Sequence, residues 1–146
     1  MNKPILSICI PTYNRSNCLK DCLDSIVVQF EDKDICRQVE IVISDNASTD
    51  DTRAVVTMFQ ERFDNIKYFR NSENLGFDRN VLNVVEKSVG DYCLTIGDDD
   101  GFLQDSLSLI IQKIKSLKTL YFILNCWGYD SELKYPVLSY AIQSNH

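Results

Sequence analysis

The chain has 146 residues, of which 45% are hydrophobic and 25% charged, a length and composition that suit one globular domain. Its net charge of −6 argues against a protein that binds a nucleic acid polymer, because such proteins need a basic face. No apolar run approaches the roughly 20 residues that cross a bilayer, and the N-terminus has no signal-peptide pattern, so we expect a cytoplasmic protein.

The chain begins with a segment typical of a buried strand, at residues 5–10. We expect this strand to end at Pro11, because proline cannot continue a central ladder of hydrogen bonds. Ser16 or Asn17 can then cap an amphipathic helix that runs to about Val28.

A polar connection without regular structure is expected at residues 31–38, followed by a second strand at residues 39–44. After a dense turn signal, Ser48 and Asp51 match a capping box. This pattern predicts a second helix that ends at about Phe63.

The second half of the chain continues the alternation of strands and helices. We expect a third strand at residues 66–70 and a third helix at residues 78–88. An apolar strand-like run then begins at Tyr92 and covers residues 92–96, followed by a fourth helix at residues 104–115 and a fifth strand at residues 120–125. Beyond Trp127 the pattern fades and predicts no clear element. Such alternation favours an α/β domain with a mostly parallel sheet.

Polar clusters follow three of the expected strands, at residues 11–15, 45–50 and 97–100. In parallel α/β sheets, ligands bind outside the carboxyl ends of the strands. All three clusters would open on that edge, and one shared pocket explains them more economically than three separate solvated turns.

The last cluster contains three consecutive carboxylates, Asp98, Asp99 and Asp100. Clustered carboxylates repel one another unless a cation offsets their charge, and one or two carboxylates with water and substrate phosphates are a common magnesium site. The alternative is an acidic, solvated turn.

The cysteines include no Cys-x-x-Cys pair and His146 is the only histidine, so we expect core or half-buried thiols and no zinc site.

Several nucleotide-binding classes lack their motif in this chain. Both Gly-x-Gly-x-x-Gly and Gly-x-x-x-x-Gly-Lys-[Ser/Thr] are absent. A receiver-type phosphoacceptor domain would want an acidic pair after the first strand, and a sugar-nucleotide pyrophosphorylase would want a glycine-rich basic loop there. The turn in this chain is Pro-Thr-Tyr-Asn.

Four segments, in this order and spacing, resemble glycosyltransferase family 2: SICIPTYNR at 7–15, EIVISDNASTDDT at 40–52, NLGFDRN at 74–80 and GDDD at 97–100. The resemblance covers about residues 5–124. It implies the GT-A fold, a Rossmann-like three-layer sandwich with a mostly parallel central sheet. It also implies transfer of a sugar from a nucleotide-sugar donor to an acceptor hydroxyl, usually with inversion and with Mg²⁺ or Mn²⁺.

The resemblance assigns expected roles to individual residues. The turn after the first strand would line the base and ribose through Pro11, Thr12, Tyr13 and Asn14. Asp45 would accept a hydrogen bond from the base, which suits the ring N–H of uracil or thymine.

Two further positions are expected near the phosphates. Arg79 matches a basic position near the nucleotide, although it is also a normal surface arginine in the first turn of a helix. The Asp-x-Asp motif is met only loosely, since its first aspartate falls on Gly97 or Asp98. The metal ligands are therefore Asp98 with Asp100 or Asp98 with Asp99.

An inverting transfer needs a general base, which the resemblance places after the fifth strand. Because family members usually run well beyond 146 residues, we expect this base beyond the chain, with His146 a candidate only by elimination. The chain is then a donor-binding half that binds a nucleoside diphosphate and transfers sugar poorly.

The expected setting is bacterial surface polysaccharide synthesis. We expect a glycan or lipid-linked acceptor and peripheral contact with the inner membrane face. We also expect self-association through residues 120–127 and 135–140. A non-catalytic nucleotide-binding module of the same fold is the alternative, and a structural α/β domain with solvated acidic turns is a third possibility.

Overall fold

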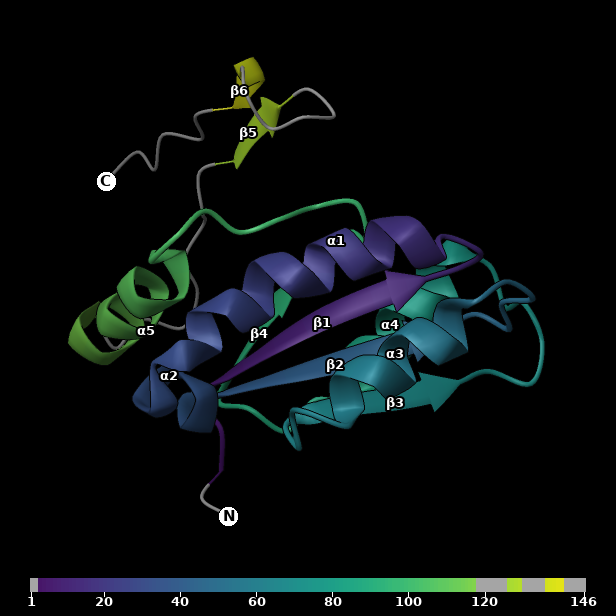
Figure 1. Ribbon diagram of the computed structural model, residues 1–146, viewed down its shortest axis with the longest axis horizontal. Helices are drawn as coiled ribbons and strands as arrows, with labels where there is room; N and C mark the ends of the chain where they lie inside the picture. The colour runs from purple at the N-terminus through teal and green to yellow at the C-terminus, as the bar shows by residue number, and fades with distance from the viewer. Residues whose placement is uncertain (1–2, 118–125, 130–135, 141–146) are drawn as a thin grey trace. The chain divides into compact units, whose positions relative to one another are not determined.

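The computed structural model describes residues 3–117, 126–129 and 136–140. The chain divides into two compact units, Met1–Lys115 and Ser116–His146, which are considered separately. In the first unit, a four-stranded sheet lies between helices, with α1 and α3 in front of it and α4 behind it (Figure 1). This is the layered α/β arrangement that the sequence predicts.

All four strands of this sheet are parallel, and their order is β3-β2-β1-β4. Their bounds are Leu6–Thr12 for β1, Val39–Asp45 for β2, Ile66–Arg70 for β3 and Tyr92–Thr95 for β4. Every residue of β1 and β2 is buried, because these central strands have a neighbour on each side and helices on both faces. Cys9 and Val42 pack with Val84 of α4 on one face of the sheet.

Strand β1 continues through Pro11, although the sequence predicts that it ends there. Pro11 is paired in register with Ser44 of β2, while pairing with β4 stops at Cys9 and Thr95. The Cys9 carbonyl accepts a hydrogen bond from Ile96 N of the β4 side, and Pro11, two residues on, faces the same side. Pro11 has no backbone N–H, but its nitrogen faces the space beyond the end of the β4 ladder, so no ladder hydrogen bond is lost.

The predicted helices form within a few residues of their expected bounds: α1 at Ser16–Val27, α3 at Thr52–Gln60, α4 at Phe77–Glu86 and α5 at Ser106–Leu117. α1 and α5 each bury four or more apolar residues, and α3 buries Val56 and Phe59, as amphipathic helices on a sheet do. α4 buries only Asn80 and Val84. Within the described residues, no helix is both long and apolar enough to cross a membrane.

The prediction that residues 31–38 form a polar connection without regular structure is wrong. The 3₁₀ helix η1 covers Val28–Glu31, and the short helix α2 covers Lys33–Gln38. Asp32 caps α2, because its Oδ1 atom accepts hydrogen bonds from the backbone N–H groups of residues 34 and 35. Burial of Phe30 and Ile35 fixes this segment against the core.

The predicted capping box of α3 does not form. The Ser48 hydroxyl accepts a hydrogen bond from Asn14 N, and the side chain of the N-cap residue Asp51 makes no capping hydrogen bond. Asp50 takes over that role, since its Oδ1 atom accepts hydrogen bonds from the backbone N–H and the hydroxyl of Thr52. Within the turn after β2, Ser48 therefore bonds to the turn after β1, while Asp50 bonds to the start of α3.

Strand β4 is less buried than its apolar sequence predicts. Its residues alternate between half-buried and exposed, because β4 lies at the end of the sheet order in the described part of the chain. The fifth strand expected at residues 120–125 lies outside the described residues. In the second unit, β5 (Cys126–Tyr129) pairs antiparallel with β6 (Pro136–Tyr140), although the sequence predicts no clear element beyond Trp127.

Candidate functional site at the carboxyl edge of the sheet

The turns after β1 and β2 are joined by hydrogen bonds at the carboxyl edge of the sheet. Asn14 N donates to Ser48 Oγ (2.9 Å), and Thr49 N donates to Asn14 Oδ1 (2.7 Å). Asn14 has a positive φ of 51°, a conformation that asparagine tolerates better than most residues. The first two predicted clusters thus form one continuous surface.

The turn after β4 joins the same edge through Asp98. The Thr12 hydroxyl donates to Asp98 Oδ2 (2.7 Å), and Arg15 Nη1 lies 3.1 Å from Asp98 Oδ1. The Asp98 side chain is only 5% exposed. Burial raises the pKa of Asp98, while the Thr12 hydrogen bond and the Arg15 charge oppose this rise.

The other two aspartates of the triplet have different surroundings. Asp99 is exposed and its Oδ2 atom lies 2.8 Å from Arg15 Nη2. Asp100 Oδ2 accepts a hydrogen bond from Gly97 N (2.7 Å), so its side chain folds back over its own turn. A Cβ atom on Gly97 would lie 2.7 Å from Asp99 Oδ1 and 3.2 Å from Asp100 Oδ2. The two carboxylates therefore converge over Gly97, where an aspartate would force the exposed Asp99 carboxylate to shift.

The triplet offers the hard oxygen donors that Mg²⁺ and Mn²⁺ prefer. Among the residues that the structure describes, no three acidic, cysteine or histidine side chains are arranged as a metal cluster. A site that uses one or two carboxylates and completes its shell with water and phosphate does not need such a cluster. The donor set thus fits a divalent ion held together with a ligand.

Asp45 lies at the end of β2 but is fully buried. Its Oδ1 atom accepts a hydrogen bond from Ser48 N (2.8 Å), and its Oδ2 atom accepts one from the Tyr68 hydroxyl and lies 3.6 Å from Arg70 Nε. Burial and the bond to Asp45 raise the pKa of Tyr68. Both carboxylate oxygens are thus already engaged by protein donors, so base recognition by Asp45 remains a prediction.

The remaining predicted site residues lie at this edge or beside it. Pro11 and Thr12 are buried, whereas Tyr13 is exposed at the turn. Arg79 is exposed in the first turn of α4 and makes no ion pair or hydrogen bond with the described part of the chain. His146 lies outside the described residues.

Asn80, next to Arg79, connects three elements at this edge. Its buried side chain donates to the Ser44 carbonyl (2.9 Å) and to the Thr12 carbonyl (3.4 Å), and it accepts from the Ser44 hydroxyl (2.7 Å) and from Asn71 Nδ2 (3.0 Å). α4 thereby holds the carboxyl ends of β1 and β2 in place.

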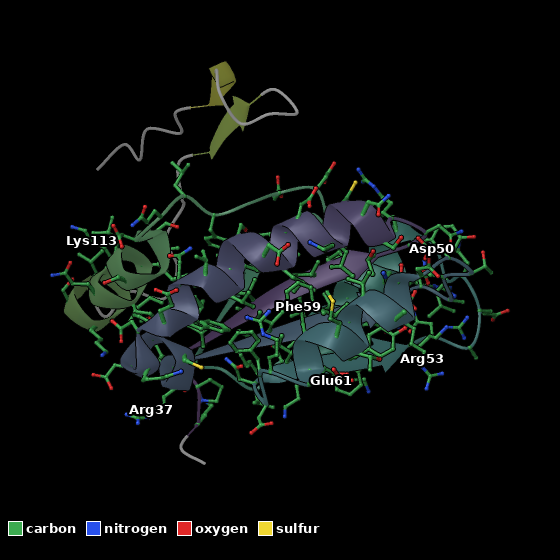
Figure 2. The ribbon with its side chains drawn as sticks, in the orientation of Figure 1. Arg37, Asp50, Arg53, Phe59, Glu61 and Lys113 are labelled. Carbon is green, nitrogen blue, oxygen red and sulfur yellow. The ribbon has the colours of Figure 1, made fainter. Side chains whose placement is uncertain are left out.

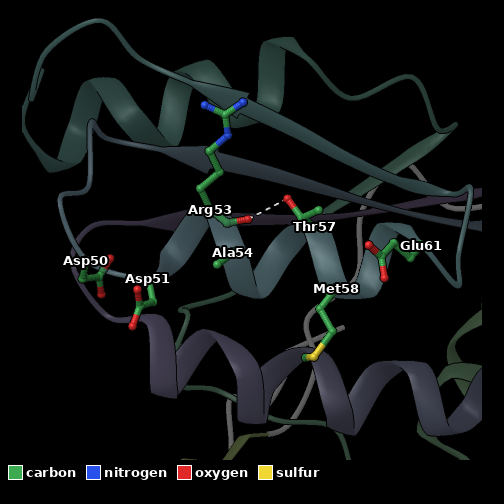
Figure 3. Close-up of a pocket in the computed structure, with 7 residues that line it drawn as sticks. All are labelled: Asp50, Asp51, Arg53, Ala54, Thr57, Met58 and Glu61. Carbon is green, nitrogen blue, oxygen red and sulfur yellow. Dashed lines mark hydrogen bonds between the residues drawn. The ribbon is translucent and has the colours of Figure 1, made fainter.

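Two open hollows flank the edge. One, of about 530 Å³, runs along the outer surface of α3, where Figure 3 shows Asp50 and Asp51 at one end and Glu61 at the other. The second, of about 480 Å³, lies between β3 and α4 and includes Arg70 and Lys87. Neither hollow is lined by the residues of the β1 turn or by the aspartate triplet, so the shared pocket remains a prediction.

Cys9, Cys18, Cys22, Cys36 and Cys93 are free thiols. Cys9 and Cys22 are buried, as expected for core thiols, and burial raises the pKa of Cys22 to about 12. Cys93, however, is exposed on β4, with its Sγ atom 3.1 Å from Cys9 Sγ. The hydrogen bond from Cys9 lowers the pKa of Cys93 to about 6.

The amino-acid sequence predicts no role for Arg15, Tyr68 or Asn80, although all three hold the edge together. Arg15 belongs to the conspicuous turn after β1, and a cation there matches the nearby carboxylates. Tyr68 and Asn80 give no comparable signal, because a tyrosine in a strand and an asparagine in a helix are ordinary residues at those positions.

Solved structures share this fold. TarS residues 1–349 from S. aureus in complex with UDP matches with a TM-score of 0.67 and 24% identity, over 75% of this chain and 32% of that one. The mannosyltransferase PcManGT from Pyrobaculum calidifontis, in complex with GDP-Man and Mn²⁺, matches with a TM-score of 0.65 and 22% identity, over 78% and 33%. The expected GT-A fold is thereby confirmed.

Sequence comparisons agree with the structural ones. The abequosyltransferase RfbV of Salmonella typhimurium is 42% identical over 118 residues, which are 80% of this chain and 34% of that protein. The GalNAc(5)-diNAcBac-PP-undecaprenol beta-1,3-glucosyltransferase of Campylobacter jejuni is 38% identical over 112 residues, 75% and 34%. The chain spans about a third of the length of these relatives. Residues 7–144 match the family described as Glycosyl transferase family 2, and the chain belongs to this family.

Proposed function

We propose that the chain provides the donor-binding part of a glycosyltransferase that transfers a sugar from a nucleotide-sugar to an acceptor hydroxyl. The observation that carries this proposal is the union of the β1 and β4 turns, through Thr12, Arg15 and Asp98, at the carboxyl edge of a parallel sheet. That edge is where α/β folds bind their ligands.

In this proposal, the nucleoside lies against the β1 turn and the diphosphate lies toward the triplet. Tyr13 is exposed and offers an aromatic face to the base. Pro11, Thr12 and Asn14 form the surface against which the nucleoside lies. Asp45 remains the predicted partner of the base, and its hydrogen bonds from Ser48 N and the Tyr68 hydroxyl fix the orientation of its carboxylate. Arg79 makes no ion pair or hydrogen bond with the residues that the structure describes, so its guanidinium is suited to a phosphate.

Asp98, Asp99 and Asp100 would hold Mg²⁺ or Mn²⁺ together with the diphosphate. When bound, such an ion offsets the charge that develops on the leaving nucleoside diphosphate. The chain itself contributes Thr12, whose hydroxyl fixes the orientation of the Asp98 carboxylate, and Gly97, whose lack of a side chain lets Asp99 and Asp100 converge.

The names of the relatives guide the choice of acceptor. One is an undecaprenol-linked glycan glucosyltransferase, and another, from Bacillus spizizenii, is a poly(ribitol-phosphate) beta-glucosyltransferase. We therefore propose a lipid-linked or polymeric surface glycan as acceptor, used at the cytoplasmic face of the membrane.

Calorimetric titration of the 146-residue chain with UDP, GDP and CDP, each with and without Mn²⁺, tests the proposal. We expect one diphosphate to bind only with the metal, and Asp99→Asn and Asp100→Asn to weaken that binding by at least about tenfold, since each removes a charge from the metal site. Asp105→Asn is the matched control. It changes an exposed aspartate of the next turn, whose φ of 63° asparagine tolerates, and should leave binding unchanged.

If none of the three diphosphates binds in a metal-dependent manner, the donor-site proposal is wrong. If one of them does bind, a second assay separates a transferase from a binding module. The chain is incubated with the nucleotide-sugar and a candidate acceptor, and only a transferase releases the diphosphate.

A further inference from the structure

Arg15 bridges two carboxylates of the aspartate triplet as a metal ion would. Its Nη1 atom lies 3.1 Å from Asp98 Oδ1 and its Nη2 atom 2.8 Å from Asp99 Oδ2. Among the described residues, Arg15 is the only cation within ion-pair distance of the triplet. One positive charge therefore faces three carboxylates, and the cluster retains an excess of negative charge.

The two ends of this bridge differ in how easily they can be released. The Asp98 side chain is 5% exposed and needs a positive partner, because an unpaired buried carboxylate is strongly destabilising. The Arg15 side chain is 46% exposed and can return to solvent at little cost. The arginine is thus the exchangeable member of the pair.

The backbone allows Arg15 to move its side chain without disturbing the helix. Arg15 is the residue before α1, where its carbonyl accepts the first helical hydrogen bond from Leu19 N (2.9 Å). Its side chain makes no capping hydrogen bond, so the guanidinium is free to change partner while the helix start stays fixed.

From these contacts, and resting on the donor site proposed above, we propose that Arg15 is a built-in counter-ion for Asp98 and Asp99 that a divalent metal displaces. The released guanidinium then binds the diphosphate that arrives with the metal. Arg15 thus opposes binding of the metal alone and favours binding of the metal together with the nucleotide, and a cation faces Asp98 and Asp99 at each stage.

This exchange predicts two opposite effects of Arg15→Ala. Affinity for Mn²⁺ alone should rise by about tenfold, because the competing cation is gone, and affinity for the nucleoside diphosphate at saturating Mn²⁺ should fall by about tenfold, because a phosphate partner is gone. Arg15→Lys should give smaller changes in both, since it keeps the charge but loses the two-pronged geometry.

The matched control is Arg37→Ala. Arg37 also forms an exposed ion pair, with Asp34 Oδ1 at 3.2 Å, and Figure 2 shows it at the opposite end of the first unit from Asp50. Arg37→Ala should change neither the affinity for Mn²⁺ alone nor the affinity for the diphosphate at saturating Mn²⁺. Calorimetry with Mn²⁺ alone, and with Mn²⁺ plus the diphosphate, gives both values for every variant.

A second measurement follows the wild-type chain directly. The Nε–Hε resonance of Arg15, assigned by its loss in Arg15→Lys, should shift when Mg²⁺ is added without nucleotide. An unshifted resonance at Mg²⁺ concentrations that move the Asp98 backbone signal would overturn the exchange, as would unchanged or weaker Mn²⁺ affinity in Arg15→Ala.

The two proposals fail separately. If Arg15→Ala tightens Mn²⁺ but no diphosphate binds to any variant, the counter-ion role stands and the donor site is wrong. If the wild type binds Mn²⁺ with a diphosphate but Arg15→Ala changes neither affinity, the donor site stands and the counter-ion role is wrong.

Discussion

Asp50 shows how one surface carboxylate fixes the starts of two helices. Its Oδ2 atom accepts a hydrogen bond from Ser16 N at the start of α1 (2.9 Å), and its Oδ1 atom accepts from Thr52 N (3.1 Å) and Thr52 Oγ1 (2.6 Å) at the start of α3. These bonds satisfy backbone donors that the first turn of each helix leaves open. Asp50 thus couples the two helices in front of the sheet.

We expect Asp50→Ala to lower the free energy of unfolding by about 1–2 kcal/mol at pH 7, because it removes caps from both helices. Urea denaturation followed by circular dichroism measures this change. Asp51→Ala is the matched control, because Asp51 is the exposed neighbour and its side chain makes no capping hydrogen bond. A loss in Asp51→Ala as large as that in Asp50→Ala would contradict the capping role.

The same residue predicts a pH dependence. Burial alone would raise the pKa of Asp50, but hydrogen bonds from Thr52 and Ser16 lower it below its ordinary value of 3.8. Because the folded-state pKa is depressed, the stabilisation is fully present above the unfolded-state pKa and is lost as the pH falls through the folded-state value. The difference in unfolding free energy between wild type and Asp50→Ala should therefore shrink below about pH 4.

At the scale of elements, α4 acts as a clamp on the ends of the central strands. Asn80 of α4 bonds to Ser44 of β2 and to the Thr12 carbonyl of β1, and Asn71 bonds to Asn80 from the loop that leads into α4. A buried amide that satisfies all of these groups holds one arrangement of the strand ends, because any shift leaves a polar group unpaired. The candidate site is built on those strand ends.

We expect Asn80→Ala to lower the free energy of unfolding by roughly 2–4 kcal/mol, because it removes four hydrogen bonds of a buried amide, including the one that the buried Ser44 hydroxyl donates. Asn83→Ala, on the same helix, is the matched control. Asn83 is half-buried and donates one hydrogen bond, to Asn71 Oδ1 (3.2 Å), so its loss should cost less than about 1 kcal/mol. Equal costs for the two variants, measured by urea denaturation, would show that Asn80 is not a clamp.

At the scale of the whole molecule, the first unit holds every buried hydrophobic residue that the structure describes, from Leu6 to Ile114. Its sheet and helices pack around these buried residues. A unit with its own hydrophobic core is expected to fold independently.

We therefore expect a chain that ends at Leu117 to unfold cooperatively, with a thermal midpoint within about 5 °C of that of the 146-residue chain. Thermal denaturation followed by circular dichroism compares the two. The absence of a cooperative transition in the shorter chain would mean that residues 118–146 are needed for the fold.

The amino-acid sequence by itself predicts the order of strands and helices in the first unit. Apolar runs and helical spacing are local signals, so β3 forms at its predicted residues and the other elements of this unit shift by only a few. The sequence also predicts which turns carry polar clusters, because parallel strands end on one edge. The α2 helix is missed because its signal rests on two buried apolar residues in a polar segment.

The tertiary structure alone decides what each polar side chain does. Asp98, Asp99 and Asp100 are identical in sequence, yet one is buried against Thr12 and Arg15, one is exposed, and one folds back on Gly97. Asp45, predicted to meet a base, is enclosed by Tyr68 and Arg70. These differences arise from contacts between residues far apart in the chain, whose strength depends on burial and distance, and neither quantity is written in the local pattern of residues.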